Sequence, residues 1–348
     1  MMKNKKAFAV LSSVALVSSV FLAACGGGEQ SGSAENGEGA VKAQTIKVAN
    51  YFATDHPQNV ALNEKFKPLV EEGSKGTLKV EIYDNSKLGA EQEFYDGVRN
   101  GTIEMGIPGM IMQADVEKMA VPEWPFLFKD YDHVEKVLNG PIGEEITADL
   151  ESKHGVTPLA WSANGFRMFS SNKTLSSIDD FKGLRVRMPS IPNYIRQGEL
   201  LGANVTPMPI SEVFTALEQK VVDGQDNPIA TVRASGWYEV QSDILESNHM
   251  FSPNIYIINS KFFNGLTPEQ QQVIRDAAAE SAKYEFELMK KSYADDKKFL
   301  EDNGVKFTTP DDKFKADMEN AMKPLYDDIF AKYPWAKDMY DKIKAEAK

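Results

Sequence analysis

The sequence has only one cysteine, Cys25, and only four histidines among its 348 residues. A single cysteine excludes an intramolecular disulfide bond and a cysteine-rich metal site. The histidines lie far apart, and no two of them have the spacing of metal ligands on one helix, so we expect no metal and no other cofactor. Basic residues are also few, 39 against 51 acidic ones, which gives a net charge of −12. No nucleic-acid partner is expected, because an acidic surface repels phosphate backbones.

The first 24 residues have the composition of an export signal. Three lysines within the first six residues precede an uncharged run over residues 7–24, and Leu22-Ala23-Ala24 stands directly before Cys25. A basic head, an apolar run and small residues before a cut are typical of secretory signals. We therefore predict a lipoprotein signal peptide over residues 1–24 and a lipid such as palmitate on Cys25. The alternative is a transmembrane segment, but the run of about 18 residues is rich in serine and marginal for a span.

Residues 26–44 consist mostly of Gly, Ser, Glu, Ala and Asn, a composition that forms a flexible linker rather than a fold. We therefore expect residues 25–44 to be a lipidated tether that holds an extracytoplasmic body at the cell membrane. Chemistry driven by ATP or NAD is not expected there, and the chain has neither a G-x-x-x-x-G-K nor a G-x-G-x-x-G motif.

Short apolar runs alternate with longer amphipathic ones from residue 45 onward. This alternation predicts an α/β fold with a largely parallel sheet covered by helices. Two such series, about 80 residues apart, predict two lobes. The expected strands are residues 46–49, 78–83, 103–107, 184–188, 204–207 and 221–223, and the expected helices are 57–72, 91–99, one that ends at 201 and one that begins at 211.

One predicted helix is much longer than the others. Thr267 is the predicted N-cap, Pro268 the first helical residue and Gln270 the second half of a capping box. The helical pattern continues to Asp302, where Asn303-Gly304 ends it. Such a helix is about 52 Å long, so we expect it to bridge both lobes or to bind a partner. A coiled coil is the alternative, but the apolar positions keep no clean heptad.

Arg187 is the first candidate for ligand binding. Leu184, Val186 and Met188 alternate with Arg185 and Arg187, and the following proline ends the strand. Ligands of open α/β sheets bind at the carboxyl ends of strands, and the arginine fork suits a carboxylate. The alternative is that both arginines face solvent or pair with some of the many acidic residues.

Two further segments offer polar groups. Ser211 is the predicted N-cap of a helix whose free N–H groups favour anions. Residues 221–228 read as a buried strand that runs into a polar turn, in which Gln225 and Asn227 offer side-chain amides. The alternative is that these side chains cap the next helix, and Asp223 and Asp226 are expected to be structural.

Several segments of this body closely resemble the solute-binding proteins of TRAP transporters. They are Gly165–Arg167, Lys182–Pro189, Leu201–Asn204, Thr206–Pro209, Ser211–Glu218, Val222–Pro228, Asn85–Gly89 and Trp124–Phe128. The similarity covers residues 45–348 and implies a two-lobed, periplasmic-binding-protein-like (Venus-flytrap) α/β fold that the long helix crosses. We expect lobe I at residues 45–164 plus 253–292 and lobe II at 165–252 plus 293–348.

The resemblance also implies the site residues. The family's ligand arginines correspond to Arg187 and Arg167, and its asparagine before proline corresponds to Asn227. Lesser contacts correspond to Ser190, Ile210, Asn50 and Tyr51. Some members have a polar residue after the third strand where this chain has Pro108-Gly109, so the contribution of the first lobe is left open. Four aromatic residues can either line the pocket or belong to the core: Tyr51, Trp161, Tyr194 and Trp237.

The function implied by the resemblance is that of a receptor, not an enzyme. It binds an organic-acid anion by hinge closure and delivers it to TRAP membrane permease subunits for ion-gradient-driven uptake. Four-carbon dicarboxylates and sugar acids both fit two arginines and an amide, and dicarboxylates are preferred as the commoner family ligand. The alternatives are an exported enzyme for small carboxylates and a ligand-dependent sensor co-receptor. No Ser-His-Asp order, paired-acid motif or histidine cluster supports an enzyme.

Overall fold

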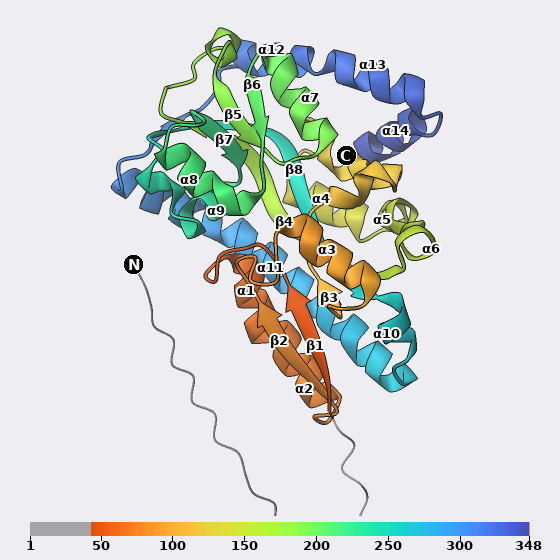
Figure 1. Ribbon diagram of the computed structural model, residues 1–348. Helices are drawn as coiled ribbons and strands as arrows, with labels where there is room; N and C mark the ends of the chain where they lie inside the picture. Colours follow the sequence, from red (N-terminus) through yellow and green to blue (C-terminus); the bar gives the residue numbers. More distant parts are fainter. Residues whose placement is uncertain (1–42, 348) are drawn as a thin grey trace, which may run out of the picture. The chain divides into compact units, whose positions relative to one another are not determined.

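The computed structural model describes residues 43–347. The predicted signal peptide, Cys25 and nearly all of the predicted tether lie outside the described residues. Nine strands of the described chain form one mixed sheet with the order β2-β1-β3-β8-β4-β7-β5-β6, and β9 pairs with β8 (Figure 1). The strands are β1 (Gln44–Ala49), β2 (Leu78–Tyr83), β3 (Met105–Gly106), β4 (Val156–Ser171), β5 (Arg185–Met188), β6 (Asn204–Pro207), β7 (Gly224–Asn227), β8 (Asp243–Asn259) and β9 (Lys306–Thr308).

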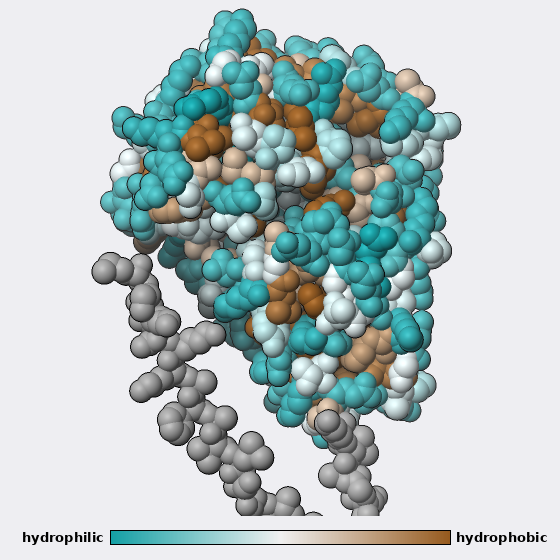
Figure 2. Space-filling view, in the orientation of Figure 1, coloured by the Kyte–Doolittle hydropathy of each residue, from teal (hydrophilic) through white to brown (hydrophobic). Residues whose placement is uncertain are grey.

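Helices pack around this sheet, and the face seen in Figure 2 is mostly hydrophilic with scattered hydrophobic residues. The helices are α1 (Pro57–Ala61), α2 (Lys67–Gly73), α3 (Glu91–Asn100), α4 (Tyr131–Leu138), α5 (Pro141–Thr147), α6 (Leu150–His154), α7 (Pro192–Leu201), α8 (Val213–Glu218), α9 (Ile229–Ala234), α10 (Ser260–Asn264), α11 (Pro268–Asp302), α12 (Asp312–Ala321), α13 (Lys323–Lys332) and α14 (Ala336–Glu346). A π-helical turn over residues 62–66 joins α1 to α2. Between residues 43 and 347, no helix combines the length and the apolar character that a membrane span needs.

The long helix α11 has the predicted bounds. The backbone N–H of Gln270 donates to Thr267 Oγ1 at 3.3 Å, and the N–H of Thr267 donates to Gln270 Oε1 at 3.1 Å, which completes the predicted capping box. Near its start α11 contributes Ile274 to the core around β1 and β2. Near its end it contributes Leu300 to a separate core around α8 and α9. The helix therefore bridges two cores, as its length predicts.

The expectation of a largely parallel sheet is only partly right. The strands are parallel at both ends of the sheet, where β1 pairs with β2 and β3 and where β5 pairs with β6 and β7. In the middle, β4 is antiparallel to both β8 and β7. Neither β4 nor β8 is predicted by the hydropathy pattern, because polar residues interrupt both strands. Their pairing is itself irregular between Ala163 and Gly165.

Three elements differ from their sequence-based predictions. The third strand is only Met105–Gly106 rather than residues 103–107. The strand predicted at 221–223 is wrong, since Val221 is 49% exposed and β7 occupies Gly224–Asn227, the predicted turn. Polar side chains of β7 have buried partners on β4, which hydropathy does not reveal. Ser211 is not an N-cap either, because it lies inside a 3₁₀ turn and the helix that follows, α8, starts at Val213.

The C-terminal helices pack against the segment that precedes β4. Tyr326 OH donates to the carbonyl of Pro125 at 2.7 Å, and His133 Nε2 lies 2.8 Å from the carbonyl of Ile343. Residues 323–346, which were expected in lobe II, therefore contact residues 124–136, which were expected in lobe I. The two expected lobes are therefore in contact next to α4, through these hydrogen bonds.

Candidate ligand-binding site

A cavity of about 410 Å³ lies at the carboxyl ends of β1, β5 and β7. Six of the seven predicted ligand residues line it: Tyr51, Arg167, Arg187, Ser190, Ile210 and Asn227. Asn50 does not, because its fully buried amide donates to Asn59 Oδ1 at 2.8 Å and accepts from the N–H of Phe52 at 3.0 Å, which shapes the turn after β1. Contact with a ligand stays a prediction for all seven residues.

Arg187 is a buried cation without an ionic partner. Its side chain is 3% exposed, and Nε and one terminal nitrogen donate to the carbonyl of Met208 at 3.0 and 2.7 Å. No carboxylate of the described residues forms an ion pair with it. Burial, reinforced by the nearby charge of Arg167, lowers the pKa of Arg187 to about 10. A buried charge without a counterion is unfavourable, so this position favours an anion.

Arg167 differs from Arg187 because its charge is already neutralised. Its Nε donates to Asp226 Oδ2 at 2.7 Å, and a terminal nitrogen donates to Oδ1 at 3.0 Å. Burial disfavours the ionised carboxyl, but the adjacent Arg167 charge holds the pKa of Asp226 below its usual range. The guanidinium also lies 4.9 Å from the ring centroid of Tyr194. Arg167 is thus fixed in place before any ligand arrives.

Three carboxyl groups that were not predicted from the sequence also line the cavity, and one of them, Glu93, caps its own helix by accepting the N–H of Ala90 at 2.8 Å. Glu91 accepts the N–H of Gly109 at 2.7 Å, and burial raises its pKa to about 7. Glu123 accepts from Tyr194 OH and, at 2.8 Å, from Gln113 Nε2, and burial raises its pKa to about 8. A signal for Glu91 was present, because it opens the helix after β2 at the same sheet edge as Arg187. For Glu123 the sequence offered no comparable indication, except that it directly precedes Trp124–Phe128, one of the segments that resemble TRAP solute-binding proteins.

Other polar candidates have structural roles. Gln225 is fully buried and donates to Ser170 Oγ at 2.8 Å, while its Oε1 accepts from Asn227 Nδ2 at 2.6 Å. It therefore orients Asn227 instead of reaching the cavity. Arg185 is exposed and pairs with Asp223 at 3.0 Å, which is the alternative considered for both arginines.

The aromatic candidates divide into two pairs. All four belong to hydrophobic cores, but Tyr51 and Tyr194 also line the cavity, whereas Trp161 and Trp237 do not. Within residues 43–347, no cluster of three or more His, Cys, Asp or Glu side chains has the arrangement of a metal site.

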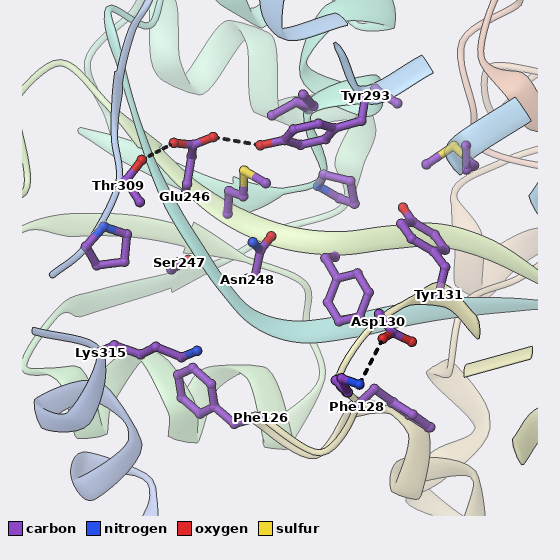
Figure 3. Close-up of a pocket in the computed structure, with 18 of the residues that line it drawn as sticks. Phe126, Phe128, Asp130, Tyr131, Glu246, Ser247, Asn248, Tyr293, Thr309 and Lys315 are labelled. Atoms are coloured by element: carbon purple, nitrogen blue, oxygen red, sulfur yellow. Dashed lines mark hydrogen bonds and ion pairs between the residues drawn. The ribbon is translucent and has the colours of Figure 1, made fainter. Parts of the chain in front are cut away.

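A second and larger cavity, of about 760 Å³, lies on the opposite face of β4 (Figure 3). Phe166 and Met168 line this cavity, while Arg167 between them lines the smaller one. Figure 3 shows Glu246 bound to Thr309 and Tyr293, with oxygen–oxygen distances of 2.6 and 2.7 Å. The larger cavity contains none of the predicted ligand residues.

Comparison with known proteins identifies the family of this chain. Residues 48–333 match the family described as bacterial extracellular solute-binding protein, family 7. The 2,3-diketo-L-gulonate-binding periplasmic protein of Escherichia coli K12 is 35% identical over 252 residues, which are 72% of this chain and 76% of the relative. The C4-dicarboxylate-binding periplasmic protein of Rhodobacter capsulatus is 31% identical over 287 residues, 82% of this chain and 86% of the relative.

A solved structure extends the match to the fold. A TRAP periplasmic solute-binding protein from Haemophilus influenzae with bound L-gulonate superimposes with a TM-score of 0.84 at 42% identity, and the match covers 87% of this chain and 99% of that one. The predicted two-lobed, periplasmic-binding-protein-like α/β fold is thereby confirmed, and these relatives are solute-binding proteins rather than enzymes. The chain therefore belongs to family 7 of the bacterial extracellular solute-binding proteins, the TRAP receptors that bind organic acids outside the cytoplasm.

Proposed function

We propose that this receptor binds a sugar acid with one carboxylate, closes around it and delivers it to TRAP membrane permease subunits for ion-gradient-driven uptake. The observation that carries the proposal is the number of cations that the smaller cavity leaves free for a carboxylate. Of the two arginines that line it, Arg167 is neutralised by Asp226, whereas Arg187 has no ion pair. Arg187 can therefore bind one carboxylate, and the second carboxylate of a dicarboxylate would find no free cation among the lining residues. This count of free cations favours sugar acids over the four-carbon dicarboxylates preferred on sequence grounds.

The similar proteins give independent support. The relative named for 2,3-diketo-L-gulonate is 35% identical and the structure with L-gulonate is 42% identical, compared with 31% for the relative named for C4-dicarboxylates. Gulonate and its diketo derivative each have a single carboxylate and several hydroxyl groups.

A thermal-shift screen tests this proposal. The purified protein is heated with L-gulonate, galactonate, glucuronate, succinate and fumarate, each at saturation. A ligand at a hundredfold excess over its Kd stabilises the folded state by about 2.7 kcal/mol. We expect a clear rise in Tm with at least one sugar acid and no chemical change in that acid after incubation. A rise with succinate or fumarate alone would contradict the proposed ligand class, and turnover would favour the exported enzyme.

We propose that the hinge of closure lies where the pairing of β4 with β8 shifts register, between Ala163 and Gly165. The expected lobe boundaries, 164/165 and 252/253, fall where Ala163 pairs with Pro253 and Gly165 with Ser252. Hinge closure around a ligand is the usual motion of two-lobed receptors. Small-angle scattering with and without L-gulonate should show a smaller radius of gyration when the ligand is bound, and an unchanged radius would argue against hinge closure.

The proposal includes membrane anchoring through Cys25. The supporting observation is the Leu-Ala-Ala-Cys order after an uncharged apolar run, and two acyl chains give stable anchoring. In bacterial cells that express the full chain, the protein should fractionate with membranes and incorporate labelled palmitate. The Cys25→Ser variant should do neither, and a variant that still incorporates palmitate would refute this attachment site.

A further inference from the structure

We propose that Glu91 is the specificity-determining residue of the smaller cavity: its carboxylate accepts hydrogen bonds from the hydroxyl groups of a sugar acid and repels the second carboxylate of a diacid. This inference rests on the proposed function and adds to it a rule for which acids are refused.

The two walls of the cavity carry opposite chemistry. Arg187 and Asn227 come from the ends of β5 and β7, and both side chains have N–H groups that suit a carboxylate. Glu91 is the first residue of α3, and Tyr51 follows β1, so these two residues form a separate wall rich in oxygen. A ligand that fits both walls needs an acceptor at one end and donors at the other.

Glu91 is held in place and keeps one oxygen available. Its Oε1 accepts the N–H of Gly109 at 2.7 Å, whereas its Oε2 has no hydrogen-bond partner among residues 43–347. The side chain is only partly buried and lines the cavity. Above its pKa of about 7 this carboxyl group is ionised, so it accepts hydrogen bonds and cannot donate them. In that state the free oxygen suits a hydroxyl group and cannot satisfy a second carboxylate.

Tyr51 and Gly109 complete this wall. Tyr51 OH accepts from Asn254 Nδ2 at 2.7 Å, which leaves the phenolic proton to be donated. A Cβ atom on Gly109 would lie 3.2 Å from Glu91 Oε1 and 3.5 Å from Tyr51 OH, so both groups approach the same backbone position closely and a side chain there would crowd them. A hydroxyl group both donates and accepts, so the tail of a sugar acid can bond to Glu91 and Tyr51 together.

Glu123 does not compete for this role. Both of its carboxyl oxygens have partners within the protein, Tyr194 OH and Gln113 Nε2. Its effect reaches the ligand through Tyr194, whose ring lies against Arg167. Glu123 is therefore a positioning residue, and Glu91 is the carboxyl group that meets the ligand.

The test uses two acids that differ at one end only. L-gulonate and glucarate share their six-carbon, hydroxyl-bearing skeleton, but glucarate has a second carboxylate in place of the terminal alcohol. Kd values are measured by calorimetry at pH 8.5, where Glu91 is ionised, for the wild-type protein, Glu91→Gln and Asp96→Asn. Asp96 is the matched control because it lies on the same helix, outside the cavity, and pairs with Arg99.

We expect the wild-type protein to prefer L-gulonate over glucarate by at least about a hundredfold, since opposed like charges cost several kcal/mol. Glu91→Gln should weaken L-gulonate binding about tenfold, strengthen glucarate binding about tenfold and so remove the preference. Asp96→Asn should keep the wild-type ratio. A folded Glu91→Gln protein with the wild-type ratio would overturn the inference.

The wild-type protein provides a second measurement that needs no variant. Hexanoate, which has one carboxylate and no hydroxyl group, should bind at least about a hundredfold more weakly than L-gulonate if hydroxyl recognition is required. Equal binding of hexanoate, or of glucarate, by the wild-type protein would overturn the role of Glu91. Absence of any sugar-acid binding by the wild-type protein would instead overturn the proposed function, so the two failures are distinguishable.

Discussion

The two cavities on opposite faces of β4 differ in charge more than in size. The larger one has about 760 Å³ and the smaller one about 410 Å³. In the larger cavity, the most buried acids are already paired: Glu246 lies 2.6 Å from Lys297 Nζ, and Asp296 lies 2.8 Å from Arg233. In the smaller cavity Arg187 faces only a neutral carbonyl. The buried arginine without an ion pair, rather than the volume, is the reason that we assign the ligand to the smaller cavity.

The largest expected effect is the loss of ligand binding when this charge is removed. Arg187→Met keeps much of the volume and removes the cation, so the affinity for L-gulonate should fall by about 3–5 kcal/mol. Arg185→Met is the matched control, because Arg185 lies two residues earlier on β5, is exposed and pairs with Asp223. Calorimetry should show near-wild-type binding by the control. Near-wild-type binding by Arg187→Met would remove the smaller cavity as the ligand site.

Sequence patterns predicted well those features that depend on neighbouring residues. The bounds of α11 follow from its capping box and its Asn-Gly stop, and those of β2 and β6 follow from local alternation. The position of Arg187 at a strand end likewise followed from alternation and one proline. Each of these signals lies within a few residues of the feature that it predicts.

Features that depend on distant partners were not predictable from sequence in the same way. The polar strand β7 is buried because Asp226 pairs with Arg167, which lies 59 residues away along the chain. Glu123 meets Tyr194 across 71 residues. The family resemblance supplied Arg167 and Asn227, but it gave no sign that Asp226 cancels one of the two arginine charges. Because that pairing leaves Arg187 as the one lining arginine free for a carboxylate, we propose a monoacid rather than a diacid as the ligand.

The backbone that separates the two cavities should be the next most sensitive point. Gly165 has a φ of +119°, and a Cβ there would lie 2.8 Å from Tyr131 OH and 3.0 Å from Met289 Cε. Gly165→Ala should therefore lower the free energy of unfolding by about 2–4 kcal/mol. Gly183→Ala is the control, since Gly183 has a φ of +74° but open space around its Cβ position, and should cost about 1 kcal/mol. Denaturant unfolding measures both, and equal losses would show that the close contacts with Tyr131 and Met289 are unimportant.

Glutamates of the two cavities should also differ in their effect on how the protein's stability depends on pH. Burial raises the pKa of Glu123 to about 8, so the folded state holds a proton that the unfolded state releases near pH 4.5. Stability is therefore lost as pH rises through the folded value, and between pH 7 and 9 the unfolding free energy of the ligand-free protein should fall by about 1–2 kcal/mol. Glu123→Gln should flatten this slope. Glu246→Gln should not, because the pKa of Glu246 is lowered; burial opposes that shift, but the bonds from Lys297, Thr309 and Tyr293 outweigh it.

The smallest expected effect is in the larger cavity. Lys315 lines that cavity, is exposed, and is labelled in Figure 3. Because solvent already stabilises its charge, Lys315→Gln should change the affinity for L-gulonate by less than about twofold. Arg187→Met also removes one positive charge, but from the smaller cavity. Comparing the two variants therefore shows the effect of where the charge lies, because the change in charge is the same. If Lys315→Gln weakened binding as strongly as Arg187→Met, solvent-exposed charge would matter as much as buried charge, and the assignment of the ligand to the smaller cavity would fail.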